Sequence, residues 1–256
     1  AGSVAGTVAT FVSPGGAQEQ CIRIEDFPGA RYSARDRETE AAYCALDVWR
    51  LALCPKLWST SPGTILYEID VEQYGGDYAR FEQQHCAYGH HTRDYAIAQR
   101  ATFKVSVNQP DTSATFAPAS WVYYHLSRYF QTQVHVPVAV YRSIDARLHR
   151  TRVVQPALAA VAGHHSLSML EAGWRFLDAV ESGGQRGRAA DAVMTDDGRQ
   201  VYGVLLNSRG RRYGAEVNGT RESGWGVGQN NDFQQTAPFL ALRSARPPSE
   251  AARDAI

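Results

Sequence analysis

The chain has 256 residues, of which 44% are hydrophobic and 20% are charged, as in a globular protein that buries a substantial core. Its 26 lysines and arginines balance 26 aspartates and glutamates, so the formal net charge is zero. No overall field therefore favours nucleic acid or a membrane surface. No apolar run approaches the ~18 residues that a membrane-spanning helix needs. We expect neither a nucleic-acid nor a membrane partner.

The four cysteines Cys21, Cys44, Cys54 and Cys86 all lie in the first third of the chain, without the spacing of a metal site. An even number permits two disulfides, with three possible pairings. The chain starts with small residues and without Met, which suits a removed secretory signal as well as a trimmed boundary. We expect a disulfide-bonded, secreted or periplasmic protein.

Hydrophobic periodicity divides the chain into interleaved strands and helices. Apolar and polar residues that alternate predict strands over residues 2–12, 21–27, 64–74, 96–107 and 134–141, and a three-strand meander over residues 192–217. Apolar residues that recur every three or four positions predict helices over residues 34–53, 77–86, 118–130 and 157–184. We expect the first helix to end at Cys54-Pro55, the second to be capped by Asp77, and the last to break at Gly163.

Hairpin connections at the C-terminal end favour an α+β fold, with a mixed, mainly antiparallel sheet and packed helices, over a doubly wound one. We divide the chain into a cysteine-containing α+β segment, residues 1–95, and a core, residues 96–256, within one continuous domain. A helix that starts after Pro247-Pro248 stops two turns later at Ile256, which indicates that the sequence ends within a larger protein.

Lys104 is our first candidate functional residue, because it is one of only two lysines in the chain. It lies on the strand predicted over residues 96–107, on the face opposite Phe103 and Val105. A helix follows over residues 118–130, whose buried stripe is predicted to be Val122, Tyr123, Leu126, Tyr129 and Phe130. The ammonium of a lysine is a compact charge on a long stem, which suits contact with phosphate.

Residues 103–145, FKVSVNQPDTSATFAPASWVYYHLSRYFQTQVHVPVAVYRSID, resemble the N-lobe core of atypical secreted kinases, such as the Golgi casein kinase and bacterial spore-coat kinases. The resemblance covers about residues 96–145. It implies an ATP-contacting role for Lys104, with ATP and Mg as cofactors of an ATP-dependent phosphotransferase. The predicted partner is a nucleotide or another phosphate-bearing small molecule.

The sequence departs from this family in two respects. The helix over residues 118–130 has no glutamate to pair with the lysine, so Glu82 and Glu216 are both candidates for that partner. The catalytic and metal-binding residues of a kinase belong to a C-lobe, for which the sequence offers only Asn230-Asn231-Asp232. The resemblance therefore leads us to expect an N-lobe without its C-lobe, which would bind a nucleotide and not catalyse.

Three alternatives remain open. The first is a non-catalytic exported binding module held by disulfides, with Trp225, Phe233 and Phe239 near its recognition surface. The second is a metal-dependent hydrolase built on His85, His90 and His91. The third is an NAD-dependent ADP-ribosyltransferase, because Ser59-Thr60-Ser61 resembles the serine-threonine-serine strand of that family. Arg23 would be the arginine that the family requires. A turn cap is the simpler interpretation of the three hydroxyl residues.

Overall fold

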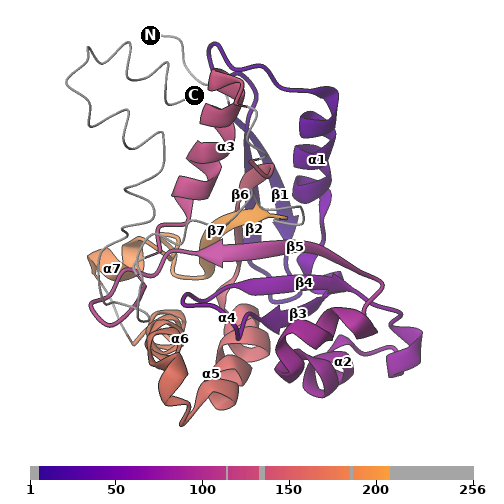
Figure 1. The fold of residues 1–256 in the computed structure, drawn as a ribbon, viewed down its shortest axis with the longest axis vertical. Helices are drawn as coiled ribbons and strands as arrows, with labels where there is room; N and C mark the ends of the chain where they lie inside the picture. The colour runs from indigo at the N-terminus through magenta and orange to yellow at the C-terminus, as the bar shows by residue number, and fades with distance from the viewer. Residues whose placement is uncertain (1–5, 114, 133–135, 185–186, 208–256) are drawn as a thin grey trace, which may run out of the picture. The chain divides into compact units, whose positions relative to one another are not determined.

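The computed structural model describes residues 6–113, 115–132, 136–184 and 187–207 (Figure 1). The chain separates into two compact units, residues 1–209 and residues 210–256, and the second unit lies outside the described residues. Every described helix and strand belongs to the first unit. Within the described ranges of this unit, no helix has both the length and the apolar character to cross a membrane.

A seven-stranded sheet in the order β1-β2-β6-β7-β5-β4-β3 forms the centre of this unit, and each neighbouring pair is antiparallel. Its strands are β1 (Gly6–Val12), β2 (Gln18–Ile24), β3 (Ala52–Pro55), β4 (Thr64–Glu68), β5 (Ala98–Val105), β6 (Ala139–Asp145) and β7 (Gln200–Leu206). The predicted α+β class is confirmed. Strands from both sides of residue 95 share the sheet, since β4 pairs with β5.

Helices cover both faces of the sheet. They are α1 (Ala34–Ala45), α2 (Tyr78–His85), α3 (Pro118–Phe130), α4 (Ala146–His149), α5 (Gln155–Val161), α6 (Ser168–Glu181) and α7 (Arg188–Asp191). On one face, Phe103 and Leu205 of the sheet pack with Trp174 and Leu177 of α6 in the main core. On the other face, α2 covers β3 and β4 while α3 covers β6 and β7 (Figure 1).

The first helix, α1, begins at a capping box and ends earlier than predicted. The Ser33 hydroxyl accepts from the Asp36 amide, and the Asp36 carboxylate accepts from the Ser33 amide, which closes a capping box at the start of α1. The predicted end at Cys54-Pro55 is wrong, because α1 stops at Ala45 and residues 52–55 form β3. Proline is tolerated there because β3 is an edge strand.

Other predicted boundaries are confirmed. The Asp77 carboxylate accepts from the Ala79 amide at 2.8 Å at the start of α2. Gly163, with φ of +78°, lies between α5 and α6, in a conformation that favours glycine. Of the predicted meander, β7 is described, whereas the part after residue 207 and the helix after Pro247 lie outside the described residues.

The buried face predicted for α3 is wrong. Val122, Tyr123, Tyr129 and Phe130 are between 45% and 65% exposed, and the buried residues of this helix are Tyr124, His125 and Ser127. On the observed buried side, Tyr124 packs in the apolar cluster with Ala139 and Val204 of the sheet. Next to it, Arg128 donates to both carboxylate oxygens of Asp36 of α1, at 2.7 and 3.0 Å. An apolar stripe alone therefore mispredicts which face is buried.

Both expected disulfides form. Cys21 on β2 bonds to Cys44 at the end of α1, and Cys54 on β3 bonds to Cys86 just after α2. Each bridge joins a strand to a helix that covers it. The two bridges lie toward opposite ends of the strand order.

Candidate functional site

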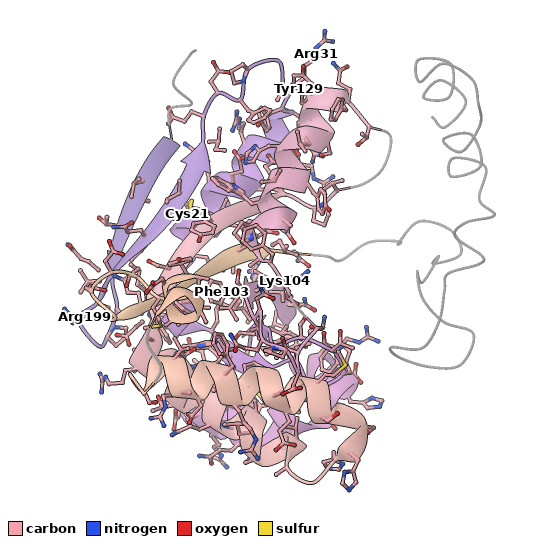
Figure 2. The ribbon with its side chains drawn as sticks, turned by 90° about the vertical axis from the view of Figure 1, so that its left-hand side faces the viewer. Cys21, Arg31, Phe103, Lys104, Tyr129 and Arg199 are labelled. Atoms are coloured by element: carbon pink, nitrogen blue, oxygen red, sulfur yellow. A yellow bond between two sulfur atoms is a disulfide. The ribbon has the colours of Figure 1, made fainter. Side chains whose placement is uncertain are left out.

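Lys104 lies on β5, an interior strand with β4 on one side and β7 on the other. Its neighbour Phe103 is 2% exposed and packs in the main core, so Lys104 projects from the opposite face. Directly across from Lys104 on β7 is Val204, which belongs to the apolar cluster beneath α3. Lys104 is half-buried (Figure 2). The candidate lysine therefore lies on the face that α2 and α3 cover in part.

The register of β3, β4 and β5 brings the two lysines of the chain into one row. The backbone N–H of Lys56, just after β3, donates to the carbonyl of Gly63 at 2.8 Å. Thr64 pairs with Phe103 on β5, so the next residues in that antiparallel register are Gly63 and Lys104. A Cβ placed on Gly63 would lie 3.9 Å from Cβ and Cδ of Lys56, so the Lys56 stem runs beside the space that the glycine leaves.

We call Lys56, Gly63 and Lys104 the lysine row. Neighbouring strands lie ~4.8 Å apart, which puts the two lysine Cα atoms about 10 Å apart. Both lysines are half-buried, whereas Gly63 between them is buried. The row thus places the two lysines of the chain on one face of the sheet, two strands apart.

The loop over residues 56–63 contains the three hydroxyl residues compared with ADP-ribosyltransferases. The Ser61 amide donates to the Ser59 hydroxyl at 3.4 Å, as in a side chain that caps a turn. Arg23, the arginine that this comparison needs, lies on β2, and β6, β7 and β5 separate it from β4. The structure does not bring these residues together.

Glu82, one of the two carboxylates suggested as partners for Lys104, lies on α2 and has other partners. Its Oε1 accepts from the backbone N–H of Leu53 at 2.7 Å, and its Oε2 accepts from Nε of Arg152 at 3.2 Å. Burial raises the pKa of Glu82, while Arg152 opposes that rise. Because Leu53 is on an edge strand, Glu82 satisfies an amide that has no further strand to pair with. Pairing of Glu82 with Lys104 stays a prediction.

Several residues named from the sequence cannot be placed. Glu216, the other suggested partner of Lys104, lies outside the described residues. The same holds for Asn230-Asn231-Asp232 and for the aromatic residues Trp225, Phe233 and Phe239. Their roles stay predictions.

The acidic residues beside α3 come from α1. Asp36 binds Arg128, and Glu40, 0% exposed, accepts from Arg37 at 2.8 Å. Burial acts to raise the pKa of Asp36, but hydrogen bonds from Arg128 and Ser33 outweigh it and lower that pKa. These carboxylates join α1 to α3.

Two of the three histidines considered as metal ligands, His85 and His91, make aromatic and acidic contacts, and the side chain of His90 lies outside what the structure describes. His85 stacks on Tyr95 with ring centroids 4.1 Å apart, and its Nε2 lies 3.3 Å from the Tyr74 hydroxyl. Burial lowers the pKa of His85. Nδ1 of His91 lies 3.3 Å from Oδ2 of Asp94. Among the residues that the structure describes, no three His, Cys, Asp or Glu side chains form a group that could hold a metal ion.

Thr64, next to Gly63, belongs to a buried network that the sequence did not reveal. Its hydroxyl lies 2.9 Å from Nε2 of His149, and Nδ1 of His149 lies 2.9 Å from Oε1 of Glu181. Burial raises the pKa of Glu181, and His149 acts in the opposite direction. All three residues are at most 9% exposed, so the network anchors the start of β4 to α4 and α6. The partners are 85 and 32 residues apart in the chain, and no periodic pattern marks them.

Comparisons with known proteins do not add to this picture. No family model, no curated protein and no solved structure matches the chain. The function is therefore argued from the lysine row and the residues around it.

Proposed function

We propose that this is an exported protein that binds a nucleotide or another phosphate-bearing small molecule at the lysine row, as part of an ATP-dependent phosphotransferase. The observation that carries the proposal is the alignment of the two lysines across β3, β4 and β5, on either side of a glycine. A phosphate presents several strong acceptor oxygens and close to two negative charges at neutral pH. Two lysines, one on each side of the strand position held by Gly63, supply positive charge that would complement such a group.

The order of parts along the chain supports a kinase-like version of this site. In protein kinases a glycine-rich loop covers the phosphates, a lysine on the third strand contacts them, and a helix then provides the partner of that lysine. Here the loop with Gly63 joins β3 to β4, Lys104 lies on the next strand, and α3 is the next helix. The loop carries one glycine at its end, so the likeness lies in the order of elements. ATP would supply the transferable phosphoryl group, and the two lysines would hold its phosphate oxygens.

The described residues fit the phosphates of ATP better than its magnesium ion. Magnesium is bound in such sites by one or two carboxylates together with phosphate oxygens. Glu82 is held by Arg152 and Leu53, and Asp36 is held by Arg128. We assign no residue to magnesium and derive no step through it.

Export is supported by the cysteines. All four are paired, and disulfides form and persist mainly in oxidising compartments. We place the protein in a secreted or periplasmic setting on this ground.

The site is tested by thermal unfolding across a millimolar titration of ATP with magnesium. A ligand present at 100 times its Kd adds about 2.7 kcal/mol to the free energy of unfolding, so the midpoint of the wild-type protein should rise. Lys104→Ala should abolish the rise, and Lys56→Ala should reduce it. Arg35→Ala removes an exposed arginine of α1 away from the row and should keep the wild-type response.

A flat wild-type titration would reject nucleotide binding and would favour the non-catalytic binding module. A rise that survives in both lysine variants would place the nucleotide elsewhere on the protein. Pyrophosphate and adenosine, tested alone, separate the two parts of the ligand. Stabilisation by pyrophosphate but not by adenosine is expected from a site that recognises phosphate.

A further inference from the structure

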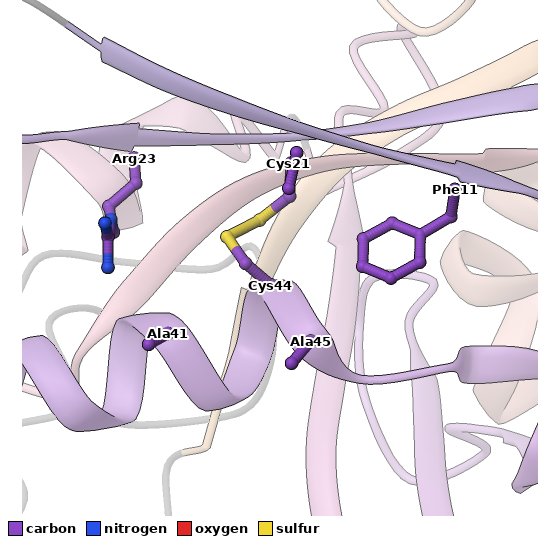
Figure 3. A pocket seen from close by; sticks show the side chains of 7 residues that line it. Phe11, Cys21, Arg23, Ala41, Cys44 and Ala45 are labelled. Carbon is purple, nitrogen blue, oxygen red and sulfur yellow. A yellow bond between two sulfur atoms is a disulfide. The ribbon is translucent and has the colours of Figure 1, made fainter.

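A cavity of about 410 Å³ lies between α1 and the hairpin of β1 and β2. Ala9 and Phe11 of β1, Cys21 and Arg23 of β2, and Ala41, Cys44 and Ala45 of α1 line it, as Figure 3 shows. Its volume falls within the range of sites that take small organic molecules. It is open to solvent along one side, because Ala41 and Ala45 are exposed.

The cavity exists because small side chains and a disulfide keep α1 and the hairpin apart at a fixed spacing. Alanine at positions 9, 41 and 45 leaves space that a larger apolar residue would fill. The bond between Cys21 and Cys44 joins strand to helix with their Cα atoms 5.4 Å apart, so the helix can neither collapse onto the strands nor drift away. The walls are therefore preorganised, which lowers the conformational cost of binding.

The charged residue that lines the cavity lies at one end of it. At the other end the ring of Phe11 covers the buried Arg142, whose Cζ is 4.8 Å from the ring centroid. Of the described residues that line it, Arg23 alone is charged, and its side chain is 27% exposed. Its acidic neighbour Glu25 is 4.0 Å away and 52% exposed, which is a loose ion pair. Figure 3 shows Arg23 on one side of the disulfide and the Phe11 ring on the other. The register sets these two ends apart along the strands, since Phe11 pairs with Glu19, four residues before Arg23.

We propose that this cavity binds a medium-chain carboxylate, with the carboxylate on Arg23 and the hydrocarbon chain over the disulfide against Phe11. The planar guanidinium matches the two oxygens of a carboxylate. The apolar walls favour a hydrocarbon chain, because they remove its surface from water. A single cation balances one negative charge, so a monoanionic carboxylate fits better than a doubly charged phosphate.

This site is independent of the lysine row. In the sheet, β6 and β7 separate β2 from β5, which carries Lys104. Cys21 belongs to the main core cluster, as does Phe103, which projects opposite to Lys104. Failure of one proposal leaves the other unaffected.

Isothermal titration of the oxidised protein with decanoate, below its micelle concentration, tests the proposal, with the neutral alcohol decanol as the matched ligand. We expect saturable one-to-one binding of decanoate, at least tenfold tighter than that of decanol. Arg23→Gln should weaken decanoate binding at least tenfold and leave decanol unchanged. Ala45→Leu, a helix-compatible change that fills the cavity, should weaken both ligands, whereas Arg35→Gln should affect neither.

Two results would overturn the proposal. One is the absence of saturable decanoate binding to the wild-type protein. The other is equal decanoate affinity in the wild type and in Arg23→Gln. Circular dichroism of each variant establishes that it is folded, and Lys104→Ala should bind decanoate as the wild type does.

Discussion

Arg142 is 1% exposed and carries a positive charge into the interior beside β2. Its Nη2 lies 3.7 Å from Oε2 of Glu19, and its Nη1 donates to the carbonyl of Tyr43 at 3.1 Å. Glu19 in turn accepts from Nε1 of Trp49 and from the amide of Asp145, each at 2.8 Å. Burial raises the pKa of Glu19, and hydrogen bonds together with Arg142 keep that rise in check. Arg142 and Glu19 therefore stabilise each other's charged form in the interior.

Replacing Arg142 by alanine should lower the free energy of unfolding by about 3–5 kcal/mol, because it leaves a buried carboxylate without its cation. Urea unfolding at pH 7 measures the change. The control is Arg100→Ala, which breaks the exposed ion pair with Glu68 and should cost about 1 kcal/mol or less. Equal losses of unfolding free energy in the two variants would mean that burial does not make the pair of Arg142 and Glu19 more important to stability than an exposed pair.

His125 on α3 is buried among the rings of Phe27, Tyr32, Trp121 and Tyr124. Its Nδ1 lies 2.6 Å from the Tyr32 hydroxyl, and the tautomer of the ring sets which of the two atoms donates. Burial lowers the pKa of His125 to about 4, and Arg37 and Arg128 act in the same direction.

The pKa of His125 in the folded state therefore lies below that of the unfolded chain, so the unfolded chain takes up the proton first. The contribution of His125 to the free energy of unfolding is fully present above pH 6.5. This group alone should lower that free energy by about 3 kcal/mol as the pH drops to 4. Chemical unfolding of the wild type and of His125→Gln between pH 7 and pH 4 isolates the contribution. The variant should show a shallower decline, and the exposed His164→Gln should follow the wild type. Parallel curves for the wild type and His125→Gln would contradict this assignment.

At the scale of the element, α3 shows where hydrophobic periodicity fails. The helix has aromatic residues around much of its circumference, so sequence periodicity cannot decide which side is buried. The observed face packs Tyr124 against Ala139 and Val204 of the sheet and lets Arg128 bind Asp36 of α1. These partners are distant in the chain, and Arg128 and Asp36 are 92 positions apart.

Single substitutions on the two sides of α3 should separate the predicted face from the observed one. Tyr124→Ala should lower the free energy of unfolding by about 3–5 kcal/mol, because a fully buried ring is lost. Phe130→Ala, at a residue 65% exposed, should change it by about 0.5 kcal/mol or less. Denaturant unfolding of both variants checks this. A larger loss of unfolding free energy in Phe130→Ala than in Tyr124→Ala would mean that the face predicted from periodicity is the buried one.

At the scale of the whole molecule, local sequence signals predicted the fold class and many of the elements. They missed β3, which was predicted as the end of a helix, and they did not predict the assembly of the sheet. Asp77 and Gly163 marked boundaries because caps and left-handed turns depend on neighbouring residues. The order of the strands depends on pairs such as β2 with β6, whose residues are more than 100 positions apart, and no local rule encodes them. The same limit applies to the site. Lys104 was found by its rarity, yet its alignment with Lys56 appears only once three strands are in register.

Each of the two disulfides lies beside one of the two proposed sites. Cys21–Cys44 closes a loop of 23 residues beside the carboxylate cavity, and Cys54–Cys86 closes one of 32 residues beside the strand that leads to Lys56. Chain entropy predicts that removing either one costs about 3–4 kcal/mol of unfolding free energy. The double variant Cys21→Ala/Cys44→Ala should therefore lose decanoate affinity and keep its response to ATP. Cys54→Ala/Cys86→Ala should do the reverse.

Titration calorimetry with decanoate and thermal shifts with ATP, both run well below the unfolding midpoint of each variant, measure the two responses. Cys44 is the one partly exposed cysteine of the four, so limited reduction of the wild type should open the bridge to Cys21 first and act like its double variant. If removing either bridge weakened both ligands equally, the disulfides would act only through overall stability. The expected crossed pattern would instead show that each bridge fixes the geometry of the site beside it, because a purely global loss of stability cannot distinguish between two ligands.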